Sequence, residues 1–213
     1  MATKENFMKA LADLRAKEAE KKDKIKFDQT LDLIINLKDY DIKKNSINTF
    51  VMLPHKFKDK MVAAFFEKKS SLVDTITKDE FDNFKDKKKM KKLVKEYDFF
   101  LASAKLMPSV AASFGRVLGP FGKMPSPQLG VLMTEDPAVI KSNIEKIDKA
   151  IKLRTKEPSI KVSIGKQSSK DEDLAENAVM VYNEVFKNLP KNKENLRNVL
   201  IKFTMSKPVK VAI

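Results

Sequence analysis

Residues 27–37 read FDQTLDLIINL, and this stretch decides the fold of the chain. Every second residue from position 31 onward is apolar, whereas Thr30, Asp32 and Asn36 fall on the opposite side of an extended chain. Successive side chains of a strand point to opposite faces of a sheet. The stretch, opened by the aromatic Phe27, therefore predicts a strand with one face in a core and the other mostly in water.

Further elements of the same style are predicted near both ends of the chain. Residues 5–22 carry apolar residues at helical spacing among Lys and Glu, and Ser169 with Glu172 has the spacing of a capping box that would start another helix. Alternating apolar residues predict three more strands, at residues 47–53, 159–164 and 199–204. Half-polar strands of this kind are typical of antiparallel sheets.

The middle of the chain has a different pattern, in which short apolar or β-branched runs precede and alternate with helical segments. Buried parallel strands of α/β proteins have this appearance. The runs lie at residues 61–66, 72–77 and 99–104, and helices are predicted at residues 86–97, 108–118 and 137–150, the last with Asp136 as its N-cap.

Together the two patterns predict a fold that combines the α+β and α/β classes. We expect a discontinuous antiparallel split α+β domain from residues 1–59 and 149–213, interrupted by an α/β domain at residues 60–148. The two chain crossings would be adjacent segments that act as a hinge. One connection is short, because only residues 67–71 separate the first two middle strands, and a parallel crossover normally needs a dozen or more residues. Either this crossover is degenerate or the two strands are not parallel neighbours.

Composition limits the partners and the chemistry that the chain can support. The 213 residues carry a net charge of +14 and a pI near 9.7, which favours a polyanionic partner, and nucleic acid over an anionic membrane. With no cysteine and a single histidine, disulfides and thiolate metal sites are excluded, and no metal, cofactor or catalytic residue is expected. Neither a membrane-spanning apolar run nor a secretory h-region is present, so the sequence predicts a soluble intracellular protein without a membrane partner.

Four of the five glycines fall at residues 115–130, among three prolines. Glycine and proline at this density predict a shaped loop. The loop lacks the spacing of a dinucleotide-binding motif, and Gly122-Lys123 is followed by Met124 where a phosphate-binding Walker loop needs Ser or Thr. A nucleotide-dependent enzyme is therefore disfavoured. The lone His55 follows Leu-Pro and is assigned to the turn that leaves the second strand.

The densest basic run lies at residues 85–95, which contain seven lysines. Such a run could bind phosphates without sequence preference. It could equally be the solvated face of a helix whose Met90, Leu93, Val94 and Tyr97 turn inward, and this second interpretation is favoured.

The outward faces of the terminal strands mix hydroxyl groups, a carboxylate and lysines. An RNA minor groove presents 2′-hydroxyls and phosphates together, and a carboxylate such as Asp32 can accept from a 2′-hydroxyl. The same composition also fits any sheet face in water, so the pattern alone does not separate the two. The residues concerned are Thr30, Asp32, Asn36, Lys161, Ser163, Lys166, Lys202 and Thr204.

Two motifs resemble those of one protein family. Residues 118–127 read LGPFGKMPSP and residues 203–211 read FTMSKPVKV, in the order found in the family of universal protein one of the large ribosomal subunit. Residues 53–55, Leu-Pro-His, are also similar to the family, and residues 97–102, YDFFLA, are similar to its archaeal and eukaryotic members. The resemblance covers most of the chain. It implies an RNA-binding α+β domain that holds both termini, with an inserted Rossmann-like α/β domain.

The resemblance also implies a function. Members are structural constituents of the large ribosomal subunit in the cytoplasm; they bind rRNA, form the mobile stalk and assist release of deacylated tRNA, without catalysis. Some also repress translation of their own messenger, and a translational repressor that acts mainly off the ribosome is the alternative. The implied partners are rRNA and, further, the chain's own mRNA and exit-site tRNA, with a monomer expected off the ribosome.

The family's RNA-binding positions can be carried across to this sequence one by one. Three departures stand out: Ser206 replaces a glycine, Phe121 replaces an Arg in the middle loop, and Ser126 replaces an Asn. A side chain at position 206 would clash or weaken binding if the backbone there is pressed against RNA. The expected RNA-binding residues are Phe27, Thr30, Asp32, Lys161, Ser163, Lys166, Lys202, Thr204, Met205 and Ser206.

Overall fold

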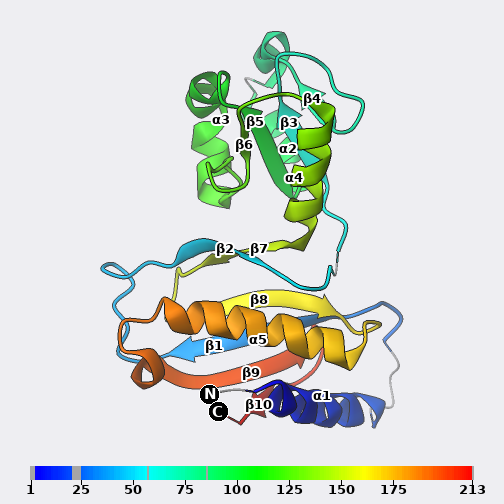
Figure 1. Ribbon diagram of the computed structural model, residues 1–213, viewed down its shortest axis with the longest axis vertical. Coiled ribbons are helices and arrows are strands. Elements are labelled where there is room, and N and C mark those ends of the chain that lie inside the picture. The colour runs from blue at the N-terminus through cyan, green and yellow to red at the C-terminus, as the bar shows by residue number, and fades with distance from the viewer. Residues whose placement is uncertain (1–2, 21–24, 57, 85, 213) are drawn as a thin grey trace. The chain divides into compact units, whose positions relative to one another are not determined.

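A four-stranded sheet organises the terminal parts of the chain in the computed structural model, which describes residues 3–20, 25–56, 58–84 and 86–212 (Figure 1). β1 (Thr30–Leu37) lies inside this sheet, antiparallel to β8 on one side and to β9 on the other. The order is β10-β9-β1-β8, with β8 at Ser159–Lys166, β9 at Leu196–Phe203 and β10 at Val209–Val211. A short 3-10 helix, η2 (Asn192–Asn195), precedes β9.

Two helices, α1 (Lys4–Ala19) and α5 (Asp171–Lys187), share one core with this sheet. Alternate residues of β1 are buried, as the sequence predicts, and belong to that core. The rings of Phe7 and Tyr182 meet edge to face at 6.4 Å and join the two helices. The opposite face of β1 is therefore left without a helix, and its side chains are half-buried.

The start of α5 differs from the prediction. The N-cap is Lys170, and its side chain makes no capping hydrogen bond, so the predicted capping box of Ser169 and Glu172 is wrong. The first turn instead contains three consecutive acidic residues, 171–173. Carboxylates there interact favourably with the positive end of the helix dipole.

A two-stranded antiparallel ladder leads to the chain crossings. β2 (Asn48–Met52) pairs with β7 (Ala150–Arg154), and the ladder is continued by a hydrogen bond from Leu53 N to Lys149 O at 2.8 Å. The sequence predicts β2 but not β7, because α4 passes directly into β7 without a turn signal. The chain divides here into two units, residues 1–58 with 149–213 and residues 59–148.

Residues 59–148 form a unit of their own around a parallel sheet of order β4-β3-β5-β6. Its core stacks Phe65 on Phe100 at 5.7 Å and tilts Phe65 against Phe114 at 4.9 Å. The strands are β3 (Val62–Phe65), β4 (Asp74–Ile76), β5 (Phe99–Ser103) and β6 (Val131–Leu132); the helices are η1 (Lys78–Phe84), α2 (Lys87–Glu96), α3 (Met107–Phe121) and α4 (Pro137–Lys149).

Of the two alternatives for the short connection after β3, the structure shows the degenerate crossover, which contains no helix. β3 and β4 are parallel neighbours, and no helix lies in the residues that join them. The prediction of a buried strand holds for β3, where all four residues are buried, but in the edge strand β4 only Ile76 is buried. An edge strand has one neighbour, so it needs no continuous apolar run.

The glycine-rich loop is shorter than predicted. α3 continues through Gly115, Gly119 and Pro120 and ends where Gly122 takes a left-handed conformation with φ of 70°. The loop proper therefore begins at Gly122. Its Lys123 ammonium donates to Val94 O and Tyr97 O at 2.8 and 2.7 Å and so caps the carbonyl end of α2.

Candidate nucleic-acid interface

The helix-free face of the β10-β9-β1-β8 sheet brings several of the predicted site residues together in rows. Asp32 is opposite Ser163 on β8 and Lys202 on β9, and Ser163 Oγ donates to Asp32 Oδ1 at 2.7 Å. Thr30 is opposite Lys166. One row therefore contains a carboxylate, a hydroxyl and an ammonium group, from Asp32, Ser163 and Lys202. The neighbouring row contains the ammonium group of Lys166.

Two further rows contain residues that the site prediction did not include. Ile34 lies between Lys161 on β8 and Leu200 on β9, and Leu200 is opposite Lys210 on the edge strand. This row has an apolar centre with a lysine at each side. Sequence alternation places Leu200 on this face. A single apolar residue on a solvent-facing side of a strand is common, however, so it does not by itself indicate a binding site.

The last row is closed by amide hydrogen bonds. Asn36 donates to Asn198 Oδ1 at 2.7 Å and accepts from Ser159 Oγ at 2.8 Å. The side chains of this row therefore bind one another. In this respect the row differs from the end of the sheet near Thr30.

At that end, Thr204 ties the turn after β9 to the start of β1. Its amide donates to Thr30 O at 3.1 Å, and its hydroxyl accepts from Thr30 N at 3.1 Å and donates to Thr30 O at 3.3 Å. The hydroxyl is therefore already engaged with the backbone, although the residue is exposed. One lone pair of the hydroxyl is left for a partner.

Ser206 turns its side chain back onto the same turn. Its Oγ accepts from Phe203 N at 2.8 Å and donates to Phe203 O at 3.2 Å. Met205 between Thr204 and Ser206 is 63% exposed. A serine in place of the family's glycine is thus accommodated by hydrogen bonds inside the turn.

Phe27 is not part of β1. The strand begins at Thr30, and Phe27 lies in a bend before it with 54% of its surface exposed, so the prediction of a strand from Phe27 is wrong. The chain leaves the sheet because Asp28 binds elsewhere: its carboxylate accepts from Ser168 N and Oγ at 3.0 and 2.8 Å, and Lys166 Nζ lies 3.8 Å away. Lys166 is therefore held beside this bend.

Gln29 is the buried centre of this end of the sheet, and the prediction missed it. Its side chain is 1% exposed; Nε2 donates to Glu18 Oε1 at 2.8 Å and to Gln167 Oε1 at 3.2 Å, and Oε1 accepts from Met205 N at 2.9 Å. One amide thus joins α1, the end of β8 and the turn after β9. By strand alternation Gln29 falls on the same side as Leu31 and Leu33, but a glutamine at that position gives no sequence signal of the partners that it binds.

Arg15 on α1 supports the same region. Its guanidinium donates to Asp171 Oδ1 at 2.7 Å and to the carbonyls of Gln167 and Ser169 at 3.0 and 3.1 Å, and lies 5.9 Å from the centre of the Phe203 ring. A planar fork of donors suits this multiple recognition. The loop between β8 and α5 is therefore fixed against α1.

Replacing Thr204 with valine tests whether the turn needs the hydroxyl. The change keeps the shape and leaves Thr30 N without its side-chain acceptor, so we expect the free energy of unfolding to fall by about 1 kcal/mol. Urea denaturation measures this loss. Thr204→Ser is the control because it keeps the hydroxyl and removes the methyl group. An unchanged valine variant together with a destabilised serine variant would show that methyl packing, and not the hydroxyl, stabilises the turn.

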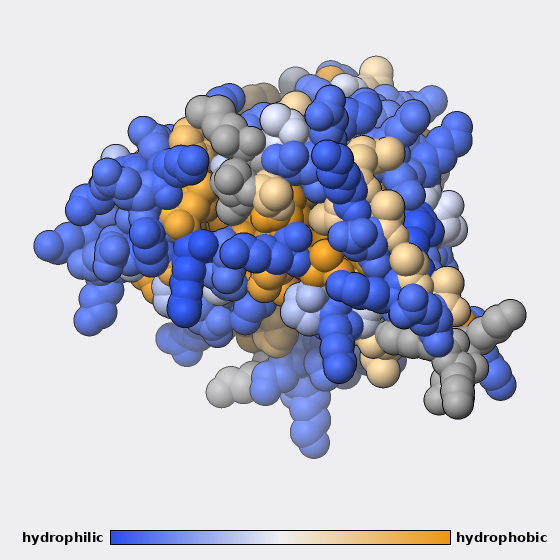
Figure 2. All heavy atoms as spheres, turned by 90° about the horizontal axis from the view of Figure 1, so that it is seen from below, coloured by the Kyte–Doolittle hydropathy of each residue, from blue (hydrophilic) through white to orange (hydrophobic). Residues whose placement is uncertain are grey.

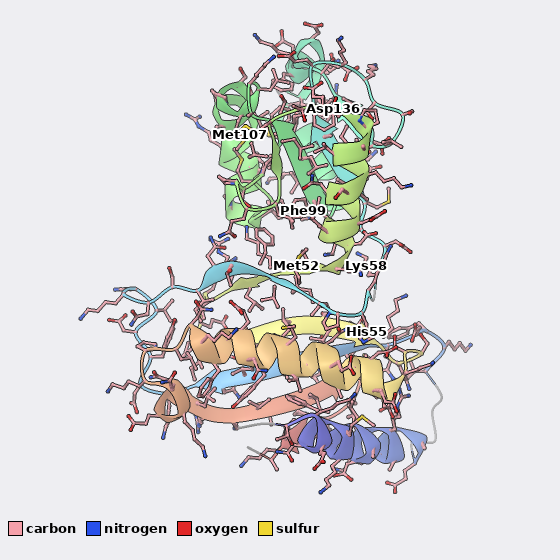
Figure 3. All side chains as sticks on the ribbon, viewed as in Figure 1. Met52, His55, Lys58, Phe99, Met107 and Asp136 are labelled. Carbon is pink, nitrogen blue, oxygen red and sulfur yellow. The ribbon has the colours of Figure 1, made fainter. Side chains whose placement is uncertain are left out.

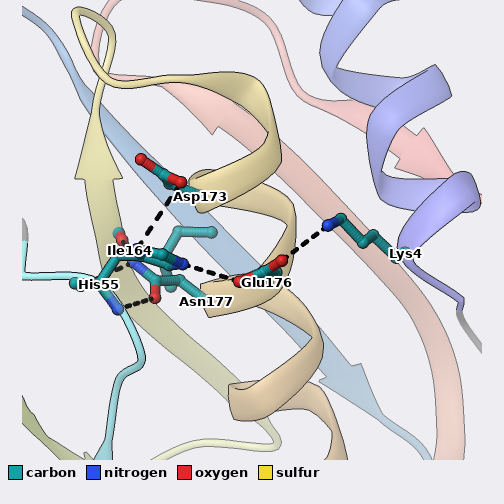
Figure 4. Close-up of polar contacts among 6 residues, drawn as sticks. All are labelled: Lys4, His55, Ile164, Asp173, Glu176 and Asn177. Carbon is teal, nitrogen blue, oxygen red and sulfur yellow. Dashed lines mark hydrogen bonds and ion pairs between the residues drawn. The ribbon is translucent and has the colours of Figure 1, made fainter.

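His55 belongs to a separate cluster on α5, beyond β2 (Figures 3 and 4). Its Nε2 lies 2.7 Å from Glu176 Oε2 and its Nδ1 3.7 Å from Asp173 Oδ1, while Lys4 Nζ binds the other Glu176 oxygen at 2.7 Å. The hydrogen bonds from Lys4 and then from His55 lower the pKa of the Glu176 carboxyl. These contacts join His55 and Lys4 to Glu176 on the surface of α5.

The backbone of His55 is held by Asn177, which is 2% exposed. Asn177 Oδ1 accepts from His55 N at 3.1 Å, and Nδ2 donates to His55 O and to Ile164 O, both at 3.0 Å (Figure 4). The segment that leaves β2 is therefore fastened to α5 and β8 through its main chain.

Seen from below, the surface is mostly hydrophilic, and smaller hydrophobic areas show between the hydrophilic residues (Figure 2). Within residues 3–20, 25–56, 58–84 and 86–212, no group of three or more His, Cys, Asp or Glu side chains is arranged so that it could hold a metal ion. No helix in that part of the chain has the length and apolar character to cross a bilayer.

The amino-acid sequence is similar to those of known proteins. Residues 16–207 match the model of the ribosomal protein L1p/L10e family. The large ribosomal subunit protein uL1 of Thermofilum pendens is 37% identical over 202 aligned residues, covering 89% of this chain and 86% of that protein. The uL1 proteins of Thermococcus kodakarensis, at 35% identity with 87% and 88% covered, and of Nanoarchaeum equitans, at 33% with 92% and 97% covered, are also similar. The chain therefore belongs to the ribosomal protein L1p/L10e family.

Proposed function

We propose that this protein is a structural constituent of the large ribosomal subunit in the cytoplasm and binds rRNA through the helix-free face of its β10-β9-β1-β8 sheet. The observation that carries the proposal is the row of Ser163, Asp32 and Lys202, next to Lys166 and the turn at Thr204. RNA presents 2′-hydroxyls and phosphates side by side in its minor groove. Acceptors and cations in adjacent rows match both groups.

The exposed apolar side chains at the same end fit this partner. Phe27 and Met205 are 54% and 63% exposed, next to residues 28–30 and 204 that are fixed by hydrogen bonds. Aromatic side chains stack on unpaired bases, and a flexible thioether adapts to a ribose or base edge. The site thus combines rigid polar groups with two apolar contacts.

We further propose the finer roles that the resemblance to the family implies. The protein forms the mobile stalk, assists the release of deacylated tRNA and represses translation of its own messenger, with residues 59–148 as an inserted Rossmann-like domain. A repressor that acts mainly off the ribosome would use the same sheet face. Sequencing the RNA that crosslinks to the protein separates the two functions. Fragments of rRNA would dominate for a ribosomal constituent, and fragments of the messenger would dominate for a repressor that acts off the ribosome.

Removing two lysines from the sheet face tests the site. The double change Lys161→Gln and Lys202→Gln should lower the slope of log affinity against log salt for large-subunit rRNA by about 2, since each lost phosphate contact removes close to one. Filter binding at several salt concentrations measures this slope. The matched control is Lys9→Gln with Lys17→Gln, two exposed lysines of α1 that lie away from the sheet face.

The same experiment distinguishes specific binding from general attraction to RNA. Wild-type protein should prefer the rRNA over random RNA of equal length even at high salt, where only specific contacts persist. Equal slopes for the sheet-face and α1 variants, or equal affinity for both RNAs, would refute the proposed site.

A further inference from the structure

The solvent face of α2 in the unit of residues 59–148 carries positive charge that the fold does not use. Met90, Leu93 and Val94 are buried on one side of this helix. At 100° per residue, the exposed lysines fall on the other side; they are Lys88, Lys89, Lys91, Lys92 and Lys95. Lys85 lies outside the described residues.

The positive charge of residues 59–148 is concentrated on this helix. Residues 59–148 contain sixteen Lys and Arg against thirteen Asp and Glu, yet residues 87–96 alone contain six Lys and one Glu. The remainder of the unit is therefore slightly acidic, and α2 supplies all of its net positive charge. On α4, by contrast, Lys141 and Glu145 alternate in sign at i, i+4.

The arrangement is electrostatically unfavourable for the helix itself. Lys88 with Lys92, and Lys91 with Lys95, are like charges at i, i+4, which destabilise a helix. The first turn has no acidic residue to offset the dipole, and only the Asp86 N-cap accepts there, from Lys88 N at 2.9 Å. Within the described part of the chain, none of the five exposed lysines forms an ion pair, even with Glu96 on the same helix.

We propose that the α2 lysine face is a second RNA-binding surface, which holds the phosphate backbone of an RNA duplex without reading its sequence. It rests on the proposed function, because RNA is the polyanion that a large-subunit protein meets. No aromatic side chain lies among the five lysines, so the face offers point charges for phosphates and no platform for bases. Its apolar residues are buried in the core, which leaves none to insert into a bilayer.

The test compares two lysine pairs in the full-length protein, with a mixed-sequence RNA duplex as the probe. Lys88→Gln with Lys92→Gln removes two charges from α2, and Lys141→Gln with Lys146→Gln removes two from α4. Wild-type protein loses affinity for the duplex when salt is raised from 50 to 200 mM, and this fold-loss should be about twelve times smaller in the α2 pair. The reason is that each of the two lost phosphate contacts contributes about 0.9 to the slope of log affinity against log salt. The α4 pair should leave this loss close to that of the wild type.

A single introduced cysteine locates the contact, because the chain has none of its own. A photo-crosslinker on Lys89→Cys should capture the duplex several times more often than one on Lys141→Cys. Thermal melting should show that the α2 pair is at least as stable as the wild type, since repulsion is relieved. Weaker binding then cannot come from unfolding.

The possible failures are distinguishable. Equal salt slopes for the α2 and α4 pairs, or equal crosslinking, would overturn the α2 surface and leave the sheet face untouched. Stronger binding to phosphatidylserine vesicles than to the duplex would also overturn it. Failure of the Lys161 and Lys202 variant to weaken rRNA binding, with the α2 result intact, would instead remove the proposed sheet site.

Discussion

Replacing Gln29 with leucine is expected to lower the free energy of unfolding by about 3 kcal/mol, because several buried polar groups lose their partner at once. Leucine nearly matches glutamine in volume but offers no hydrogen bond to Met205 N, Glu18 or Gln167. Urea denaturation measures the loss. The control is Gln128→Leu, an exposed glutamine in residues 59–148, which should change stability little.

The Gln29 variant should also bind rRNA less tightly at temperatures where it remains folded. Met205 N would no longer be held, so the turn at residues 204–206 would lose the fixed position that preorganises binding. Affinity measured well below the melting temperature tests this. Unchanged stability together with unchanged affinity would show that Gln29 holds nothing that matters at this end of the sheet.

Replacing Asn177 with aspartate should have an equal or larger effect, roughly 3–5 kcal/mol, because a buried charge would face two carbonyl oxygens. The carboxylate could still accept from His55 N but could no longer donate to His55 O or Ile164 O. Asn183→Asp, an exposed site on the same helix, is the matched control. Chemical denaturation at pH 7 gives both values.

Acid should partly restore the Asn177→Asp variant. Burial raises the pKa of the introduced carboxyl, and its protonated form regains a donor, so the deficit should shrink as pH falls from 7 to 5. A deficit independent of pH would contradict the buried geometry of residue 177.

The sequence predicts most elements correctly where buried and exposed residues alternate strictly. It fails where hydrogen bonds of polar side chains determine where an element begins. β1 was placed by its apolar residues, but its start was misplaced because Asp28 and Gln29 bind side chains and turns distant in sequence. β7 was missed because residues 150–154 follow a helix without a break. Neither feature has a local signal, since each depends on partners about 100 residues or more away in the sequence.

The candidate site was predicted in part for the same reason. Thr30, Asp32, Ser163 and Lys202 share one sheet face in the structure, because alternation fixes the face and register follows from the core. The inward-turned hydroxyl of Ser206 could not be foreseen, since it depends on the geometry of a tight turn. Whether these residues contact RNA stays a prediction.

The strand order of the β10-β9-β1-β8 sheet has a consequence for synthesis. β1 emerges early from the ribosome that makes the chain, but its two neighbours are β8 at residues 159–166 and β9 at residues 196–203. Residues 59–148 can complete their own sheet in the meantime, whereas β1 must wait. A chain interrupted before residue 196 lacks β9 and also Thr204, which ties the turn after β9 to β1, so it cannot form the proposed rRNA face. If the proposed rRNA face is correct, we expect such incomplete chains not to compete for a place in a new subunit.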